Sequence, residues 1–520
     1  MTITQWFLFF LLVQLIHFLG TWKLYIKAGR KAWEAAIPVY NAVVLMKIIN
    51  RPWWWTILLF IPIVNLIMFP VVWVETIRSF GKNSKIDTFL VLVTCGLYIY
   101  YVNYLADVTY IEDRSLKPRT EVGEWVNSIL FAVIAATLVH TYLIQPFTIP
   151  TSSLEKTLLV GDFLFVSKFH YGARTPLTAV AFPMVHDTIP LVGVKSYLSK
   201  PQIPYFRFPG FEDIERSDIV VFNWPVDTMR YMTYTDKHYY KPIDKKTNYV
   251  KRAVGVPGDS LSIVNGKINI NGKPLDLPGR SKVQYSYSVT PKGQNFDPRS
   301  LYELYDITDP YGFNSTTQTF TINLTEETAE KFKYHPNVVS IERIIDSAGV
   351  REQGLFPDNK NLAWNKDNLG PIYIPKKGAT IPLTAESVPF YKRIIEVYEG
   401  SELGINNKLG VNGTQVTLNG QKIDSYTFKQ NYYWMMGDNR HNSLDSRYFG
   451  YVPENHVVGK PVFIWMSWDT NAQGIMNKIR WERMFTTVSG DNEPVSFLPY
   501  VLILAVIWFA FSFFRKRKRA

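Results

Sequence analysis

The sequence predicts a membrane protein that combines a mainly β domain outside the bilayer with α-helical transmembrane segments. Two observations support this fold class. The first 145 of the 520 residues and the last 25 are strongly apolar. The residues between them are polar and rich in Gly, Pro, Asn and Tyr, and short β-branched or aromatic runs bounded by such residues are typical of strands. The length allows more than one domain.

Five apolar stretches are long enough to cross a bilayer. A hydrocarbon core about 30 Å thick requires roughly 20 apolar residues in a helix. The stretches are Gln5–Trp22, Trp54–Thr76, Thr88–Ala106, Trp125–Ile144 and Phe497–Phe514. One such stretch alone would also fit a buried core helix, but five in one chain favour membrane spans.

Basic residues predict the orientation of these spans, because loops rich in Lys and Arg stay in the cytoplasm. The loop after the first stretch carries Lys23, Lys27, Arg30, Lys31, Lys47 and Arg51, and the tail carries Arg515, Lys516, Arg517, Lys518 and Arg519. Both are expected in the cytoplasm. With alternating spans, the N-terminus, the loop from Arg78 to Lys85 and the polar middle region then lie outside.

The formal net charge of +12 comes mostly from these flanks. A basic excess can indicate nucleic-acid binding, but the densest run adjoins a span, which favours contact with lipid headgroups instead. The single cysteine, Cys95, excludes an intrachain disulfide and a cysteine metal site.

Strand and turn patterns fill the middle region. Ser217–Trp224 and Tyr249–Val256 read as strands, and the pairs Asn265-Gly266 and Asn271-Gly272 are hairpin signals. Residues 281–381 are polar with little pattern, apart from one expected helix at Glu326–Tyr334. YKRIIEV (residues 391–397) echoes YVKRAVG (residues 249–255), which suggests a repeated structural unit.

A possible nucleophile lies where the fourth apolar stretch ends. The segment Gln145–Lys168 contains Thr151, Ser152 and Ser153 between Pro150 and an expected strand. A serine fixed in such a turn can serve as a nucleophile if a neighbouring base takes its proton. Hydroxyl clusters are also common in ordinary loops, so this segment alone leaves both interpretations open.

The base predicted from the sequence is a lysine. GxSxG is absent, and among the histidines only His441 lies in a motif-like stretch. A lysine amine has a pKa of about 10.4 in water, and burial lowers it by disfavouring the charged form. If residues 249–256 form a strand, Lys251 faces the same side as Tyr249 and Ala253, and Arg252 faces the other. A Lys-Arg pair on a solvated strand edge is the alternative.

Three stretches taken together resemble bacterial type I signal peptidase, the membrane-bound serine peptidase that removes signal peptides from exported proteins. They are QPFTIPTSSLEKTLLVGDFLFVSK (145–168), YVKRAVGVPGD (249–259) and GDNRHNSLDSRYFG (437–450), in that order, and SDIVVFNWP (217–225) matches a further block. The resemblance covers residues 145–468 in separated blocks. It implies twisted antiparallel sheets, with the nucleophile near the membrane surface.

The resemblance also implies roles for individual residues. Ser153 is the expected nucleophile and Lys251 the general base. Thr151 and the backbone N–H of Ser153 form the oxyanion hole. Ser443 orients the lysine, while Asp445 and Arg447 brace its turn together with Asp438. The rivals are Ser152, which the register of the flanking residues disfavours, and Lys392, which lacks the Val-Gly-Val-Pro-Gly-Asp that follows Lys251.

The sequence departs from the family pattern at several places. Leu154 stands where methionine is usual, and Glu155 and Lys156 replace a more apolar pair that contains proline. Residues 274–432 are a large insertion, as in the longer Gram-negative members. None of these departures removes a reacting group.

The resulting prediction is a multi-pass signal peptidase of the bacterial cytoplasmic membrane with an extracytoplasmic catalytic domain. Its substrates would be preproteins with small residues at positions −1 and −3, its surroundings membrane lipids, and the secretion translocase a candidate partner. No metal, organic cofactor or nucleic acid is implied. Two alternatives remain: an inactive homologue that binds exported chains, and a self-cleaving regulatory Ser–Lys peptidase.

The predicted domain organisation follows from these assignments. Residues 1–124 form a membrane region with three transmembrane helices, and residues 125–144 a fourth that leads into the catalytic domain. Residues 145–273 and 431–495 form the catalytic β core. Residues 274–430 form an inserted β-rich subdomain, and residues 496–520 the last transmembrane helix and the basic tail.

Overall fold

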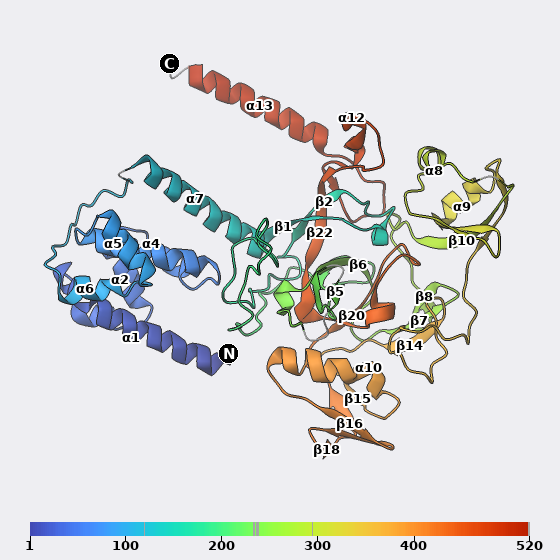
Figure 1. The fold of residues 1–520 in the computed structure, drawn as a ribbon, viewed down its shortest axis with the longest axis horizontal. Helices are drawn as coiled ribbons and strands as arrows, with labels where there is room; N and C mark the ends of the chain where they lie inside the picture. The colour runs from blue at the N-terminus through green and yellow to red at the C-terminus, as the bar shows by residue number, and fades with distance from the viewer. Residues whose placement is uncertain (119, 232–233, 236–238, 294, 518–520) are drawn as a thin grey trace. The chain divides into compact units, whose positions relative to one another are not determined.

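A computed structural model describes residues 1–118, 120–231, 234–235, 239–293 and 295–517 (Figure 1). Two residues of the predicted basic tail, Lys518 and Arg519, lie outside the described residues. The chain divides into two compact units. Unit 1 comprises Met1–Leu143, Arg174–Arg207 and Tyr240–Lys245, and unit 2 comprises Ile144–Ala173, Phe208–Tyr239 and Lys246–Ala520.

Unit 1 is helical in its N-terminal part. Its helices are α1 (Ile3–Lys27), η1 (Ala32–Ala35), α2 (Tyr40–Ile48), α3 (Trp55–Leu58), α4 (Val64–Ser79), α5 (Lys85–Val93), α6 (Tyr98–Tyr104) and α7 (Glu121–Leu138), which continues as the π-helical turn η2 (Val139–Leu143). Thr2 and Thr120 cap α1 and α7 through backbone N–H groups of the first turn.

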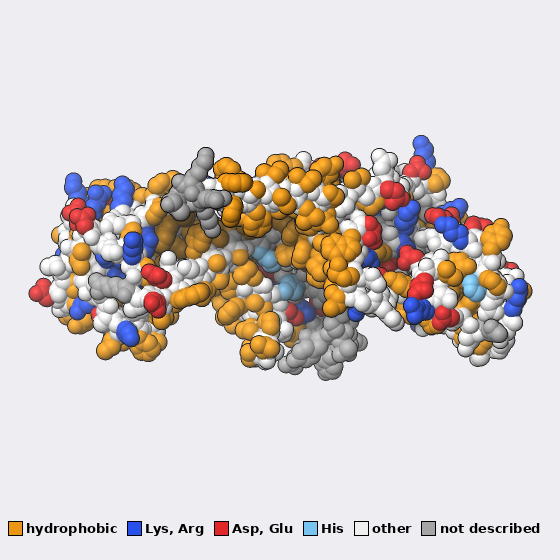
Figure 2. Space-filling view, turned by 90° about the horizontal axis from the view of Figure 1, so that it is seen from above, with side chains coloured by type: hydrophobic (Ala, Val, Ile, Leu, Met, Phe, Trp, Pro, Cys, Tyr) orange, Lys and Arg blue, Asp and Glu red, His pale blue; other side chains and the backbone are white. Residues whose placement is uncertain are grey.

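Among the described residues, three helices are long and apolar enough to cross a membrane: Ile3–Lys27, Glu121–Leu143 and Leu498–Arg515. They coincide with the first, fourth and fifth predicted spans. Almost none of their side chains are buried within the protein, as expected for helices surrounded by lipid. Figure 2 shows the visible face of α13 (Leu498–Arg517), beside the grey C-terminal atoms, as a band of hydrophobic side chains.

The second and third predicted spans differ from the expected continuous helices. Trp54–Thr76 is broken between α3 and α4, where the β-branched Ile63 takes the left-handed φ of 70°. Thr88–Ala106 is broken between α5 and α6, which meet at 118°. This bent pair would count as a fourth span only if both arms together crossed the membrane.

Contacts inside unit 1 show which segments lie next to the C-terminal end of α4. The carboxylate of Glu75 pairs with Arg51 at 3.0 Å and with Arg114 at 2.7 Å, and the N–H of Ile111 bonds the carbonyl of Ser79 at 2.9 Å. The end of α4 is therefore next to the segments that flank α2 and precede α7. The predicted placement of the following loop on the opposite side of the membrane conflicts with these contacts.

The main sheet of unit 2 is antiparallel and carries the strands that the resemblance singled out. Its order is β1-β2-β22-β3-β6-β20-β21, with β23 paired to β22. The bounds are β1 (Ile144–Thr148), β2 (Asp162–Ser167), β3 (Ile219–Asn223), β6 (Asn248–Gly255), β20 (Tyr432–Met436), β21 (Val452–Pro453), β22 (Val457–Ser467) and β23 (Thr486–Thr487). The mainly β fold with apolar helices is confirmed.

The remaining sheets of the chain are smaller. One has the order β11-β12-β10-β13 and another β14-β7-β8-β9. Their strands are β7 (Ser260–Val264), β8 (Lys267–Ile270), β9 (Lys273–Pro274), β10 (Gln284–Pro291), β11 (Gly312–Asn314), β12 (Thr319–Thr325), β13 (Val338–Arg343) and β14 (Leu369–Tyr373). Shorter strands are β4 (Met229–Tyr231), β5 (Tyr234–Thr235), β15 (Thr380–Pro382), β16 (Leu409–Asn412), β17 (Gln415–Leu418), β18 (Gln421–Lys422) and β19 (Ser425–Thr427).

Several local predictions hold. Both Asn-Gly pairs form tight turns with positive φ at both residues, between β7 and β8 and between β8 and β9. The expected helix is α9 (Glu326–Phe332). The predicted repeat is wrong: residues 249–255 belong to strand β6, whereas residues 391–397 lie in α10 (Val388–Arg393) and the π-helical turn η5 (Ile394–Tyr398).

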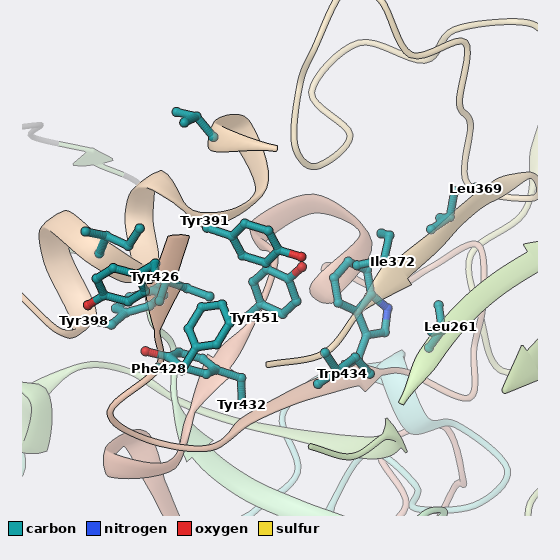
Figure 3. Close-up of a cluster of buried hydrophobic side chains, with 14 of the residues drawn as sticks. Leu261, Leu369, Ile372, Tyr391, Tyr398, Tyr426, Phe428, Tyr432, Trp434 and Tyr451 are labelled. Carbon is teal, nitrogen blue, oxygen red and sulfur yellow. The ribbon is translucent and has the colours of Figure 1, made fainter. Parts of the chain in front are cut away.

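Residues of the large insertion contribute to two cores. One cluster belongs to the β10–β13 sheet with α8 (Pro298–Tyr305) and α9, and includes Leu301, Phe320 and Phe332. The second cluster joins insertion residues that follow this sheet to side chains of β7, of β20 and of the residues next to β21. Figure 3 shows this second cluster, where Tyr391 stacks on Tyr451 with ring centroids 6.3 Å apart. The main sheet and part of the insertion therefore share one apolar core.

Candidate active site

The connection between β1 and β2 carries the predicted nucleophile. Ser153 lies in the 3-10 turn η3 (Ser152–Leu154), which follows extended backbone at Thr151. Leu154 is buried in a cluster with side chains of β2, β3 and β22, which anchors the turn against the sheet. Nζ of Lys251 lies 2.5 Å from Oγ of Ser153, within hydrogen-bond distance.

Lys251 lies inside the sheet, at the β6 position that pairs with Val220 of β3. The predicted alternation is observed: Tyr249 and Ala253 pack in one cluster and Val250 in another, and the amine is 5.3 Å from the centre of the Tyr249 ring. Lys251 is only 4% exposed. The solvated strand edge is therefore excluded for this lysine.

Burial lowers the pKa of the Lys251 amine to about 8. Loss of solvation disfavours the charged amine, and the charges of Asp445 and Asp438 offset part of this effect. A substantial fraction of the amine is thus neutral near pH 8. A neutral amine next to a serine hydroxyl can accept its proton.

Two buried ion pairs flank the lysine. Arg252 binds Asp438 through two hydrogen bonds of 2.8 and 2.6 Å, and Arg447 binds Asp445 at 2.9 and 2.8 Å. Burial alone would raise the pKa of each carboxyl group, but the arginine charges and hydrogen bonds hold both pKa values below the usual range. Asp445 also accepts the N–H of Gly437, so the pair braces the turn after β20.

Ser443 lies beside the nucleophile turn. A Cβ placed on Gly437 would contact both Oγ of Ser443 and the carbonyl oxygen of Ser153. Oγ of Ser443 is buried and bonds none of the described residues, so the structure contains no hydrogen bond from Ser443 to the lysine amine. Thr151 is exposed directly before the turn.

The rival residues have other surroundings. His441 faces Asp367 at 3.2 Å through Nε2, and its Nδ1 accepts the N–H of Ser286. Lys392 is exposed on α10. Oγ of Ser152 accepts a hydrogen bond of 2.9 Å from the side chain of Asn442. Of the two candidate serines, only Ser153 has its hydroxyl within hydrogen-bond distance of a lysine amine, that of Lys251.

The sequence interpretation missed the residues that hold the backbone of the turn. The N–H of Asn439 bonds the carbonyl of Ser153 at 3.1 Å, and its side-chain amide bonds the carbonyl of Ser152 at 3.1 Å. The same amide donates to Asp309, in the insertion. The asparagines lie in the stretch 437–450 and could have been considered, whereas no sequence signal marks Asp309.

A serine against a buried lysine, on an antiparallel β domain of a chain that also carries apolar helices, is an arrangement that fits a membrane-bound hydrolase. Comparison with known families identifies which one. The profile of the family described as "Signal peptidase, peptidase S26" matches residues 90–328 and 375–468. The chain therefore belongs to the signal peptidase family, peptidase S26, whose members are serine peptidases.

Individual relatives agree with this assignment. Signal peptidase I of Buchnera aphidicola (subsp. Acyrthosiphon pisum) is 25% identical over 392 residues, which cover 74% of this chain and 90% of the relative. Signal peptidase I of Haemophilus influenzae is 25% identical over 399 residues, covering 72% and 79%. That of Rickettsia massiliae is 29% identical over 163 residues, covering 31% and 48%.

A second profile matches the N-terminal region. Residues 33–113 match a family described only as being of unknown function, DUF5684. This match contains α2 to α6 and their breaks.

Proposed function

We propose that this protein removes N-terminal signal peptides from exported preproteins at the outer face of the membrane, with Ser153 as nucleophile and Lys251 as general base. The observation that carries the proposal is the 2.5 Å contact between Oγ of Ser153 and the buried amine of Lys251. Family membership supports the reaction class, and the three apolar helices support membrane attachment.

The chemistry follows from the two groups. Neutral Lys251 takes the hydroxyl proton as Ser153 attacks the scissile carbonyl, which gives a tetrahedral adduct. The protonated amine gives this proton to the leaving nitrogen as the C–N bond breaks, and the acyl part of the substrate stays on Ser153 as an ester. Neutral Lys251 then takes a proton from a water molecule that attacks the ester, and it returns this proton to Oγ of Ser153 as the C–O bond breaks and the acid leaves. Thr151 and the N–H of Ser153 are the expected donors to the oxyanion.

The substrate is a preprotein whose signal peptide is still inserted in the membrane. Bilayer lipids are then part of the working environment, and the secretion translocase is a candidate partner. The surrounding ion pairs, Arg252–Asp438 and Arg447–Asp445, serve to hold the lysine strand and the turn after β20 in register.

We also propose an orientation in which the Ile3 end of α1 and Ser153 are on the outer side. Nε1 of Trp6 bonds the carbonyl of Gln202 at 2.9 Å within unit 1, and residue 202 follows α7 and Ser153 in the chain. The segment from α2 to α6 would enter and leave from the cytoplasmic side, since the end of α4 meets Arg51 and Arg114.

Cleavage of a model preprotein in detergent tests the reaction. Ser153→Ala is expected to abolish cleavage while Ser152→Ala keeps most of it, because Ser152 Oγ bonds Asn442 rather than the lysine. A dead Ser152→Ala with an active Ser153→Ala would move the nucleophile by one residue. A folded wild type that binds preproteins without cleaving them would favour an inactive binding homologue.

Accessibility of introduced cysteines tests the orientation in a Cys95→Ser background. Lys292→Cys, exposed directly after β10, is expected to react with a membrane-impermeant maleimide from outside, and Lys85→Cys only after permeabilisation. Reporter fusions after Lys168 and after Arg519 should be outside and inside, respectively. Labelling of Lys85→Cys from outside would contradict this orientation and support the original prediction, in which the chain crosses the membrane twice between α1 and α7.

A further inference from the structure

The inserted region contacts the nucleophile turn through one short segment. Asp306–Asp309 follows α8 and belongs to unit 2, like Ser153 itself. All contacts described below therefore lie inside one compact unit. The inference rests on the proposed function, because it assigns a role in positioning Ser153.

Asp309 is the centre of the first set of contacts. Its carboxylate accepts hydrogen bonds from the side-chain amides of Asn439, Asn442 and Asn323. Asn439 also holds the carbonyls of Ser152 and Ser153, and Asn442 holds Oγ of Ser152. Asp309 is 5% exposed, so these bonds form where water competes little.

A second set of contacts holds the other side of the turn. The hydroxyl of Thr308 donates to Glu155 at 2.8 Å, and Lys156 pairs with Asp306 at 2.8 Å. Glu155 also accepts the N–H of Val160 at 3.2 Å. Burial raises the pKa of Glu155 despite these bonds. Glu155 and Lys156 are the pair that replaces the family's more apolar, proline-containing pair after the nucleophile.

The contacting segment is itself fixed to the inserted sheet. Leu301 and Ile307 are buried in the core of that subdomain, and Asp306 closes α8 in a left-handed conformation with φ 52°. Asn323 belongs to β12, and its side-chain oxygen accepts the hydroxyl of Ser286 on β10 at 2.7 Å. The sheet can therefore hold the segment at a defined position.

We propose that Asp309 and Thr308 of the insertion are positioning residues for Ser153. They fix the turn on both sides of the nucleophile, so that its Oγ stays within hydrogen-bond distance of Lys251. Neither residue touches the substrate's reacting atoms in this scheme; each acts through Asn439, Asn442 or Glu155.

The expected effect is on kcat. Displacement of a reacting group by about 1 Å can cost on the order of 100-fold in rate. Asp309→Ala removes the common acceptor of three amides and is expected to lower kcat at least about tenfold with KM within about twofold. Asp309→Asn keeps one acceptor oxygen of the same shape and should recover part of the loss.

Asp358→Ala is the matched control. Asp358 is an aspartate of the same insertion, paired with Arg351 at 2.6 Å and exposed, and no described contact joins it to the nucleophile turn. Full-length variants in detergent are compared for kcat, KM and thermal midpoint, with rates expressed per folded molecule from near-UV circular dichroism.

The outcomes separate the two proposals. A low kcat for Asp309→Ala with partial recovery in Asp309→Asn, and a near-wild-type Asp358→Ala, would support positioning. Wild-type kcat per folded molecule in Asp309→Ala would overturn it, even if the thermal midpoint fell. Failure of the proposed function appears differently, as wild-type protein that cleaves no preprotein or as an active Ser153→Ala.

Discussion

Two segments of this protein carry nearly the same residues and have opposite surroundings. In YVKR, Lys251 occupies the strand β6 inside the main sheet and is 4% exposed. In YKR, Lys392 occupies the helix α10 and is exposed. Burial lowers the pKa of the Lys251 amine to about 8, whereas an exposed lysine keeps its solvation.

The difference shows that a lysine becomes a candidate base through its position in the sheet. Lys251 has strands on both sides, β3 and β20, so water reaches its amine poorly. Lys392 follows Tyr391, which packs into the aromatic core, but Lys392 itself points away from that core because helical neighbours face different directions. Each prediction below tests or sharpens this contrast.

The largest expected effect is the loss of cleavage in Lys251→Arg. A guanidinium remains charged and cannot act as a base, so kcat/KM should fall on the order of 10²–10⁴-fold, the usual contribution of a general base. Lys392→Arg should remain near wild type, and His441→Ala should lower activity modestly at most. Substantial cleavage by Lys251→Arg would remove the lysine from the mechanism.

Gly437→Ala should have the next largest effect. The added Cβ would lie 2.5 Å from the carbonyl oxygen of Ser153, so the nucleophile turn must move away from Lys251. We expect kcat to fall by roughly 10–100-fold. Gly312→Ala is the control, since a Cβ there meets nothing within 4 Å. Equal activity of the two variants would show that the turn tolerates displacement.

The pH dependence of kcat/KM should reflect the Lys251 amine. Only the neutral amine can take the proton, so activity should rise with pH through about 8. The charge of Asp445 raises the pKa of this amine, and Asp445→Asn should therefore shift the acid limb to lower pH. Asp358→Asn should not move it. An acid limb that Asp445→Asn leaves in place would point to another titrating group.

The last expected effect is on stability and leaves catalysis aside. The folded-state pKa of Lys251 is about 8, below the 10.5 of a solvated lysine, so its burial costs stability when the amine is protonated in the unfolded chain. Lys251→Met should then stabilise the folded protein at pH 7 by up to about 3 kcal/mol. The gain should shrink above pH 8 and vanish above the unfolded pKa. Thermal midpoints measured against pH, with Lys392→Met as the control, check this; a pH-independent difference would contradict it.

Short-range signals were sufficient for many elements. Both Asn-Gly turns, the strands β3 and β6 and the helix α9 follow from local pattern, because turn chemistry and side-chain alternation act within a few residues. The inserted sheet was less visible, although Tyr285, Tyr287 and Val289 alternate inward along β10 and Asp297-Pro298 mark the start of α8.

The membrane region shows a limit of hydropathy. Trp54–Thr76 and Thr88–Ala106 are apolar enough to be predicted as spans, and hydropathy alone does not reveal their breaks. A left-handed Ile63 is costly for a β-branched residue, so surrounding contacts must hold that turn. The pairing of Glu75 with Arg51 and Arg114 then holds the end of α4 next to the segments that precede α3 and α7.

The sequence by itself determined the family resemblance, three of the five predicted apolar helices, the mainly β domain and the choice of Ser153 and Lys251 as candidates. Only the tertiary structure brought these two residues, 98 positions apart, to 2.5 Å and placed the lysine amine out of water. It alone also brought Asp309 to the nucleophile turn. The physical reason is that burial and contacts between distant segments depend on how strands pair across the whole chain, and no local pattern encodes that pairing.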